Sequence, residues 1–245
     1  MIQSYKKIIT GASDQLIDRY KKTKNILGIF LIGSAARGTF DEYSDIDFFI
    51  ILAKQGKYRR QKFSTETNFD VEILFNTVKE VRQYLEGEKT SLYRNTSHML
   101  ENGKIIYQTS PKVRQLQHTA QKNMRTRIKY SNDEIVMHKY SIDDFLEDAR
   151  RDAAHNDVIA FHLDSHFLIQ NSIELFLKLS NNSYRKPKEM ARLLQSIDRH
   201  FVVLLQNFYK IRTLQDKLKK LEQISNFVLK KSGGKLPQKW ELRSN

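Results

Sequence analysis

Two aspartates, Asp45 and Asp47, are the first residues of this sequence whose types and spacing could do chemistry. They stand two positions apart, just before the apolar segment 48–52, so on a strand both carboxylates project from the same face. Neighbouring carboxylates repel each other unless a cation lies between them, which makes the pair a natural site for a hard divalent metal ion. The spacing therefore predicts a metal site where that strand begins.

A second group of acids stands in the apolar segment 69–75. Strand alternation puts Asp70 and Glu72 on the face opposite to Val71 and Ile73, so either acid can complete a cluster of three carboxylates. Such a cluster can hold two Mg²⁺ ions, which activate an attacking oxygen and stabilise a leaving pyrophosphate. The residues themselves leave the choice between Asp70 and Glu72 open.

A Gly-Ser turn, Gly33-Ser34, directly follows the apolar segment 26–32. Its free backbone N–H groups can face a phosphate, Ser34 offers a hydroxyl, and Arg37 can add a charge-assisted contact. Ser44, which stands next to Asp45, is a further candidate nucleotide-binding residue. Gly-Ser turns are common, so the prediction of a nucleotide site depends on the combination of this turn with the acids that follow it.

Apolar runs and their spacing indicate the elements that must position these residues. Short runs rich in β-branched and aromatic residues predict buried strands at 26–32, 46–52 and 69–75, with a further short strand at 104–107. The polar, basic stretch 53–68 separates two of these strands. An amphipathic helix is predicted for about the first twenty residues, and Thr77 is a candidate N-cap for a helix over 77–86.

The pattern changes near Ser110-Pro111, which predicts two domains. Residues 1–110 are expected to form an α+β domain with a small mixed sheet and flanking helices, and residues 111–245 an all-α helical bundle. Helices in the second part are expected near 111–129, 141–152, 157–179, 188–195, 198–209 and 213–231.

Composition narrows the class of protein. The absence of cysteine excludes disulfides and thiolate metal sites. The first ten residues lack the apolar core of a signal peptide, and no apolar run is long enough to cross a bilayer, so we expect a cytoplasmic protein without a membrane segment. The net charge of +14 favours polyanionic partners such as nucleotides or RNA.

The motifs Gly33-Ser34, Asp45-Ile46-Asp47 and Val71-Glu72-Ile73 resemble the signature of the nucleotidyltransferase superfamily that includes DNA polymerase β. Within it they are similar to the antibiotic-modifying branch, of the kanamycin nucleotidyltransferase type. The resemblance implies that Asp45, Asp47 and Glu72 are catalytic metal ligands, that two Mg²⁺ ions bind, and that ATP or another nucleoside triphosphate is the co-substrate.

The same resemblance implies a helical domain that supplies a general base and a cation near the phosphates. The segment 143–151 resembles it, with Glu147 in the position of the base and Arg151 in place of the expected lysine. An i, i+4 spacing puts both side chains on one helix face. Asp144 and Asp148 remain alternatives for the base.

The implied reaction is Mg²⁺-dependent transfer of a nucleoside monophosphate, AMP if ATP is the donor, to a hydroxyl of a small molecule such as an aminoglycoside-like antibiotic, with release of pyrophosphate. Related drug-modifying enzymes pair two protomers, so a homodimer is compatible with the resemblance. The charge of +14 argues against a polycationic acceptor. The alternatives are an antitoxin-type transferase that nucleotidylates a partner protein or RNA, and a non-catalytic nucleotide- or RNA-binding module on the same scaffold.

Histidines suggest two weaker hypotheses. His162 and His166 have the i, i+4 spacing of zinc ligands, but no His-Glu-x-x-His pattern accompanies them. Arg150 and His155 resemble a short ribonuclease motif of helical toxin domains. A ribonuclease would need no nucleoside triphosphate, which distinguishes it from a transferase.

Overall fold

The computed structural model describes residues 2–65 and 68–242. The chain divides into two compact units, Met1–Thr126 and Arg127–Asn245, which are described separately. Helix α5 (Lys112–Arg125), which the sequence analysis placed at the start of the helical domain, packs against helices and a strand of the first unit. The first compact unit therefore runs beyond residue 110.

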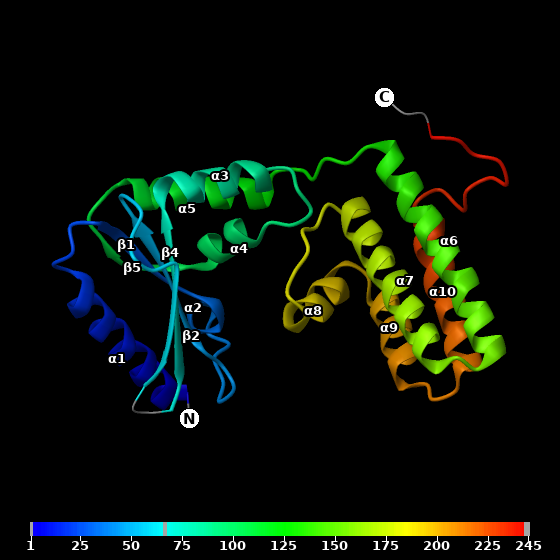
Figure 1. Cartoon of the computed structure of the whole chain (residues 1–245), viewed down its shortest axis with the longest axis horizontal. Helices are drawn as coiled ribbons and strands as arrows, with labels where there is room; N and C mark the ends of the chain where they lie inside the picture. The colour runs from blue at the N-terminus through cyan, green and yellow to red at the C-terminus, as the bar shows by residue number, and fades with distance from the viewer. Residues whose placement is uncertain (1, 66–67, 243–245) are drawn as a thin grey trace. The chain divides into compact units, whose positions relative to one another are not determined.

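A mixed sheet of five strands forms the centre of the first unit, in the order β3-β4-β2-β1-β5. Strands β2 and β4 are parallel and the other neighbouring pairs are antiparallel, which confirms the predicted small mixed sheet (Figure 1). The strands are β1 (Ile26–Ile32), β2 (Ile46–Leu52), β3 (Arg60–Ser64), β4 (Asp70–Thr77) and β5 (Lys104–Gln108).

Strand β3 lies in the basic stretch for which the sequence predicted no strand. Its sequence is Arg-Gln-Lys-Phe-Ser, and most of its side chains are exposed. Because β3 lies at the border of the sheet and its side chains are mostly exposed, its sequence contains no apolar alternation from which a strand could be predicted. Pairing with β4 holds it in place.

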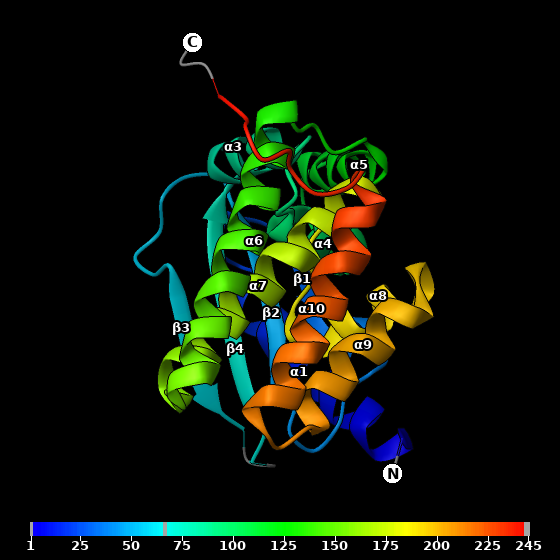
Figure 2. The same ribbon diagram turned by 90° about the vertical axis from the view of Figure 1, so that its right-hand side faces the viewer.

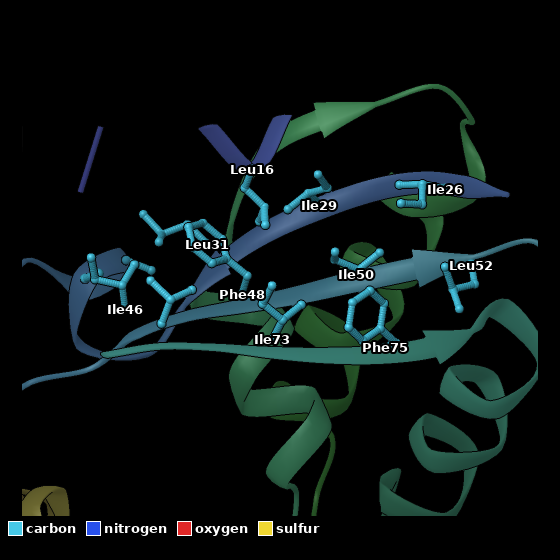
Figure 3. Close-up of a cluster of buried hydrophobic side chains, with 13 residues drawn as sticks. Leu16, Ile26, Ile29, Leu31, Ile46, Phe48, Ile50, Leu52, Ile73 and Phe75 are labelled. Carbon is cyan, nitrogen blue, oxygen red and sulfur yellow. The ribbon is translucent and has the colours of Figure 1, made fainter. Parts of the chain in front are cut away.

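Helices cover both faces of the sheet. Helix α1 (Ile2–Tyr20) packs Leu16 onto the face that carries Ile29, Phe48 and Ile73, as Figure 3 shows. The opposite face, with Phe30, is covered by α3 (Val78–Glu88), α4 (Asn95–Asn102) and α5. Each fully buried aromatic or aliphatic side chain of this kind stabilises the fold by about 1.5–3 kcal/mol.

Helix α3 begins at the predicted cap. The Thr77 hydroxyl accepts a hydrogen bond from the backbone N–H of Glu80, and the Glu80 carboxylate accepts one from the backbone N–H of Thr77. This capping box satisfies two N–H groups that the first turn of a helix leaves without partners. The prediction of Thr77 as N-cap is confirmed.

The second unit is helical in the part that the structure describes. Helices α6, α7 and α10 pack side by side, and α9 packs against α8 and α10 (Figure 2). Helix α6 begins nine residues earlier than predicted, because Ser131 and Glu134 form a capping box there. The helices are α6 (Asn132–His155), α7 (Val158–Leu179), α8 (Pro187–Ile197), α9 (Arg199–Lys210) and α10 (Leu214–Lys231). Among the described residues, no helix combines the length and the apolar character that a membrane span requires.

Candidate active site

One row of side chains crosses four strands near one end of the sheet. In this row Ile32 of β1 lies opposite Asp47 of β2, Asp47 lies beside Glu72 of β4, and Glu72 lies opposite Lys62 of β3. Residues in register on neighbouring strands project from the same face, and neighbouring strands lie about 4.8 Å apart. The fold therefore brings together the carboxylates of Asp47 and Glu72, which stand far apart in the sequence.

The other two acids lie on either side of this pair. Asp45 precedes β2 by one residue and is two positions before Asp47; its side chain is 46% exposed. Asp70 is the first residue of β4, and its carboxylate accepts a hydrogen bond of 2.7 Å from the Ser64 hydroxyl. Glu72, and not Asp70, is the in-register neighbour of Asp47, so strand register favours Glu72 as the third ligand.

The Gly-Ser turn lies against Asp47. Gly33 has a φ of +68°, and a Cβ built on it would lie 2.2 Å from Oδ2 of Asp47. Both the left-handed backbone and the close approach of the carboxylate require glycine at this position. Ser34 is half-buried in the one-turn helix α2 (Gly33–Arg37), and Arg37 is exposed at its end. The predicted phosphate turn and the predicted metal ligands are thus neighbours.

A hydrogen-bonded loop leads from α2 to the acids. The Asp41 carboxylate accepts hydrogen bonds from the backbone N–H of Tyr43 at 3.1 Å and from the Ser44 hydroxyl at 2.6 Å. The Ser44 hydroxyl also accepts a hydrogen bond from the backbone N–H of Asp41, and Ser44 is buried. Ser44 therefore fixes the loop immediately before Asp45, whereas its predicted contact with a nucleotide stays a prediction.

Two cations of strand β3 lie among the acids. Nζ of Lys62 lies 2.8 Å from Oδ2 of Asp70 and 4.0 Å from Oδ2 of Asp45, and Nε of Arg60 lies 3.4 Å from Oε1 of Glu72. The hydrogen bond between Lys62 and Asp70 is the main reason that the pKa of Lys62 is raised and the pKa of Asp70 is lowered. Neither cation was predicted from the sequence as a site residue, because the stretch 53–68 has only a general basic character there.

The acids fit a divalent metal in donor chemistry and in backbone placement. All the donors are carboxylate oxygens, as Mg²⁺ prefers, and the glycine at position 33 leaves the space that the Asp47 carboxylate fills. As the side chains stand, paired with Arg60 and Lys62, no group of three or more His, Asp or Glu residues within 2–65 and 68–242 is arranged to hold a metal ion. Within those residues, His162 and His166 are likewise not part of a group that could hold zinc.

Three candidate residues of the second unit, Glu147, Asp148 and Arg151, are held in ion pairs on α6. Glu147 pairs with Arg150, and Arg150 also pairs with Glu222 of α10 at 2.9 Å. Arg151 pairs with Asp148. The roles of Glu147 as base and of Arg151 as a phosphate contact stay predictions, and Arg150 has a structural role in joining α6 to α10.

Comparison with known proteins shows a family likeness for the first unit. Residues 14–112 match the family model described as "Polymerase beta, Nucleotidyltransferase". Among solved structures, a nucleotidyltransferase-like protein from Exiguobacterium sibiricum is similar over 91% of this chain and 76% of its own, with 12% sequence identity and a TM-score of 0.49. No curated protein matches the sequence. The matched residues include the whole sheet and the acidic row, so the part of the chain that holds the candidate site is similar to the polymerase β-like nucleotidyltransferases.

Proposed function

We propose that the protein is a metal-dependent nucleotidyltransferase that transfers a nucleoside monophosphate from a nucleoside triphosphate to an acceptor hydroxyl. The observation that carries the proposal is the register of Asp47 with Glu72, beside Gly33, in a polymerase β-like domain. In the reaction the acceptor oxygen forms a bond to the α-phosphorus, the bond from that phosphorus to the bridging oxygen breaks, and pyrophosphate leaves with its electron pair.

Each residue of the acidic row has a proposed task. Asp45, Asp47 and Glu72 would hold Mg²⁺, with two ions as the expected number. When bound, Mg²⁺ offsets the charge of the phosphates and lowers the pKa of an attacking hydroxyl. The backbone at Gly33 and the hydroxyl of Ser34 would orient the triphosphate, as the position of the turn against Asp47 suggests.

Three further side chains complete the proposal. Arg37, at the end of α2, would contact the triphosphate with its guanidinium group. For the proton of the acceptor hydroxyl we keep Glu147 as the receiving base, with Asp144 and Asp148 as alternatives and Arg151 as a phosphate contact. The assignments in the second unit rest on the resemblance of the segment 143–151 to the helical domains of related transferases.

The acceptor is proposed to be a hydroxyl of a small molecule, such as an aminoglycoside-like antibiotic, with ATP as the donor. The net charge of +14 favours a second candidate, an antitoxin-type transferase that modifies RNA or an acidic partner protein, because a polycationic drug is repelled by such a field.

A panel assay distinguishes these acceptors. The full chain is mixed with Mg²⁺, one α-labelled nucleoside triphosphate at a time, and aminoglycosides, transfer RNA or a protein extract, and both pyrophosphate and labelled acceptor are followed. Label on an aminoglycoside supports the first candidate, and label only on RNA or protein supports the second. Absence of pyrophosphate release with every triphosphate and every acceptor would leave a non-catalytic nucleotide- or RNA-binding module.

A further inference from the structure

The edge strand β3 gives the acidic row its own cations. Lys62 is in register with Glu72, two positions along the same strand from Arg60, so alternation places both cations on one face of the sheet. This is the face from which Asp47 and Glu72 project, because all of them belong to aligned rows. The pairing of β3 with β4 therefore places both cations beside the acids.

Arg60 and Lys62 contact three carboxylates, those of Asp45, Asp70 and Glu72. Lys62 lies between Asp70 and Asp45, with Nζ at 2.8 Å and 4.0 Å from their carboxylate oxygens, and Arg60 contacts Glu72 at 3.4 Å. Ser64 donates a hydrogen bond to the same Asp70 and so fixes the carboxylate that holds Lys62. Asp70 thus holds the Lys62 ammonium group beside the proposed metal ligands.

These ion pairs contribute little to the stability of the fold. The side chains of Arg60 and Lys62 are 64% and 54% exposed, and ion pairs between exposed groups contribute little to stability. Their effect is local and electrostatic, because several carboxylates crowded at one edge repel each other unless positive charge lies among them. A divalent cation and the two side-chain cations would neutralise the same carboxylates.

We propose that Lys62, assisted by Arg60, is the resident counter-cation of the acidic row and is exchanged for the divalent metal when the metal binds. The inference rests on the proposed function, because it takes Asp45 and Glu72 as metal ligands. Lys62 is a positioning residue in this scheme: it keeps the acids together without metal, and its charge lowers their affinity for metal. Metal binding then requires Nζ of Lys62 to move away from Asp45.

Metal affinity measured without nucleotide tests the exchange. Mn²⁺ is titrated into the full-length wild type and variants, and free Mn²⁺ is followed by electron paramagnetic resonance. Lys62→Met is expected to bind Mn²⁺ about fivefold more tightly than wild type, a size typical of a partly exposed charge, whereas Lys62→Arg keeps the wild-type affinity. Arg60→Gln is expected to act in the same direction with a smaller effect.

Lys79→Met is the matched control, because it removes the same charge from the opposite end of β4, in the first turn of α3. It is expected to leave Mn²⁺ affinity unchanged, since charges more than about 10 Å apart are screened at ordinary ionic strength. Wild-type binding that disappears in Asp45→Asn, together with unchanged or weaker binding by Lys62→Met, would overturn the exchange and leave the proposed function standing. No Mn²⁺ binding by any of the proteins would overturn both.

A second measurement follows Lys62 itself in the unaltered protein. The rate at which an amine-reactive reagent modifies Lys62 is read by peptide mass spectrometry with and without saturating Mn²⁺. Exchange predicts faster modification of Lys62 in the presence of metal, with no change at Lys79. An unchanged or slower rate at Lys62 would contradict the proposal whatever the stability of the variants.

Discussion

The carboxylate of Asp47 fills the space that any side chain at position 33 would need. A Cβ on Gly33 would lie 2.2 Å from Oδ2 of Asp47, closer than two such atoms can approach. The turn that is proposed to orient phosphate and the acid that is proposed to hold metal are therefore mutually dependent. Each fixes where the other can be.

Gly33→Ala is accordingly expected to damage both stability and activity. The left-handed backbone alone costs a non-glycine residue about 1–2 kcal/mol, and the clash must also displace Asp47. We expect a lower midpoint of thermal unfolding and loss of most pyrophosphate release. Gly11→Ala is the control: nothing lies within 4 Å of its Cβ, and the change in the middle of α1 should stabilise the protein by about 0.5–1 kcal/mol. Equal behaviour of the two variants would contradict the argument.

Replacing the acids by their amides should separate catalysis from folding. Asp45→Asn, Asp47→Asn and Glu72→Gln are each expected to lower turnover by about a thousandfold, because the charge that holds metal is lost. The unfolding midpoint should change little for Asp45→Asn, since that side chain is 46% exposed. Turnover is measured as pyrophosphate release, with Glu86→Gln, an exposed acid of α3, as the unaffected control.

Asp70→Asn distinguishes the two candidates for the third ligand. Because Asp70 binds Lys62 and Ser64, its replacement should cost much less activity than Glu72→Gln. A loss in Asp70→Asn as large as the loss in Glu72→Gln would transfer the ligand role to Asp70.

Ser44 and Asp41 offer a test of positioning against direct binding. If Ser44 acts by holding the loop, Ser44→Ala and Asp41→Ala both remove the hydrogen bond from the Ser44 hydroxyl to the Asp41 carboxylate, and each should lower turnover by about tenfold. The double variant should then lower turnover by less than the product of the two single effects, because the two residues share one hydrogen bond. A much larger loss in Ser44→Ala would indicate that its hydroxyl contacts the nucleotide.

The pair of Glu134 and Lys178 predicts a pH dependence of stability in the second unit. The pKa of Glu134 is lowered below its ordinary 4.5, chiefly by the hydrogen bond from Lys178. A lowered carboxyl pKa in the folded state adds stability above about pH 4.5 that is lost as the pH falls through the folded pKa. We expect Glu134→Gln to lower the unfolding midpoint at pH 7 and to approach wild type in acid, once the pH has fallen below the lowered pKa of Glu134.

Lys178→Met is the informative partner variant. The Lys178 side chain is only 10% exposed, so removing Glu134 leaves a buried ammonium group without its carboxylate, at a cost of about 1–3 kcal/mol. Replacing the lysine by an apolar residue of similar size removes that cost, so Lys178→Met should destabilise the protein less than Glu134→Gln does. A greater loss of unfolding free energy in Lys178→Met than in Glu134→Gln would show that the lysine is stabilised by other groups.

The strands that are buried could be predicted from sequence, and the exposed one could not. Strands β1, β2 and β4 have apolar runs or alternation because the core requires them, so their positions were predicted almost to the residue. Strand β3 lies at an edge and carries Arg60 and Lys62, which have no pattern of burial. The cations of the site were missed for the same reason as the strand.

The pairing of the acids lies beyond what periodicity can predict. Alternation puts Asp70 and Glu72 on one face, but only the parallel register of β4 on β2 decides that Glu72 lies beside Asp47. A shift of two residues would have put Asp70 there and kept every apolar side chain in the core. The resemblance of Val71-Glu72-Ile73 to a known motif, rather than the hydrophobic pattern, made that distinction.

Strand β3 is an edge of the sheet, and its side chains affect whether a further strand can pair there. In the part of the chain that the structure describes, β3 pairs with β4 on one side only, so a strand of another chain could add to its other side. Charged side chains on such a border discourage that pairing, because a second strand would have to bury or displace them. We therefore expect the charges of Arg60 and Lys62 to disfavour strand addition by other copies of the protein.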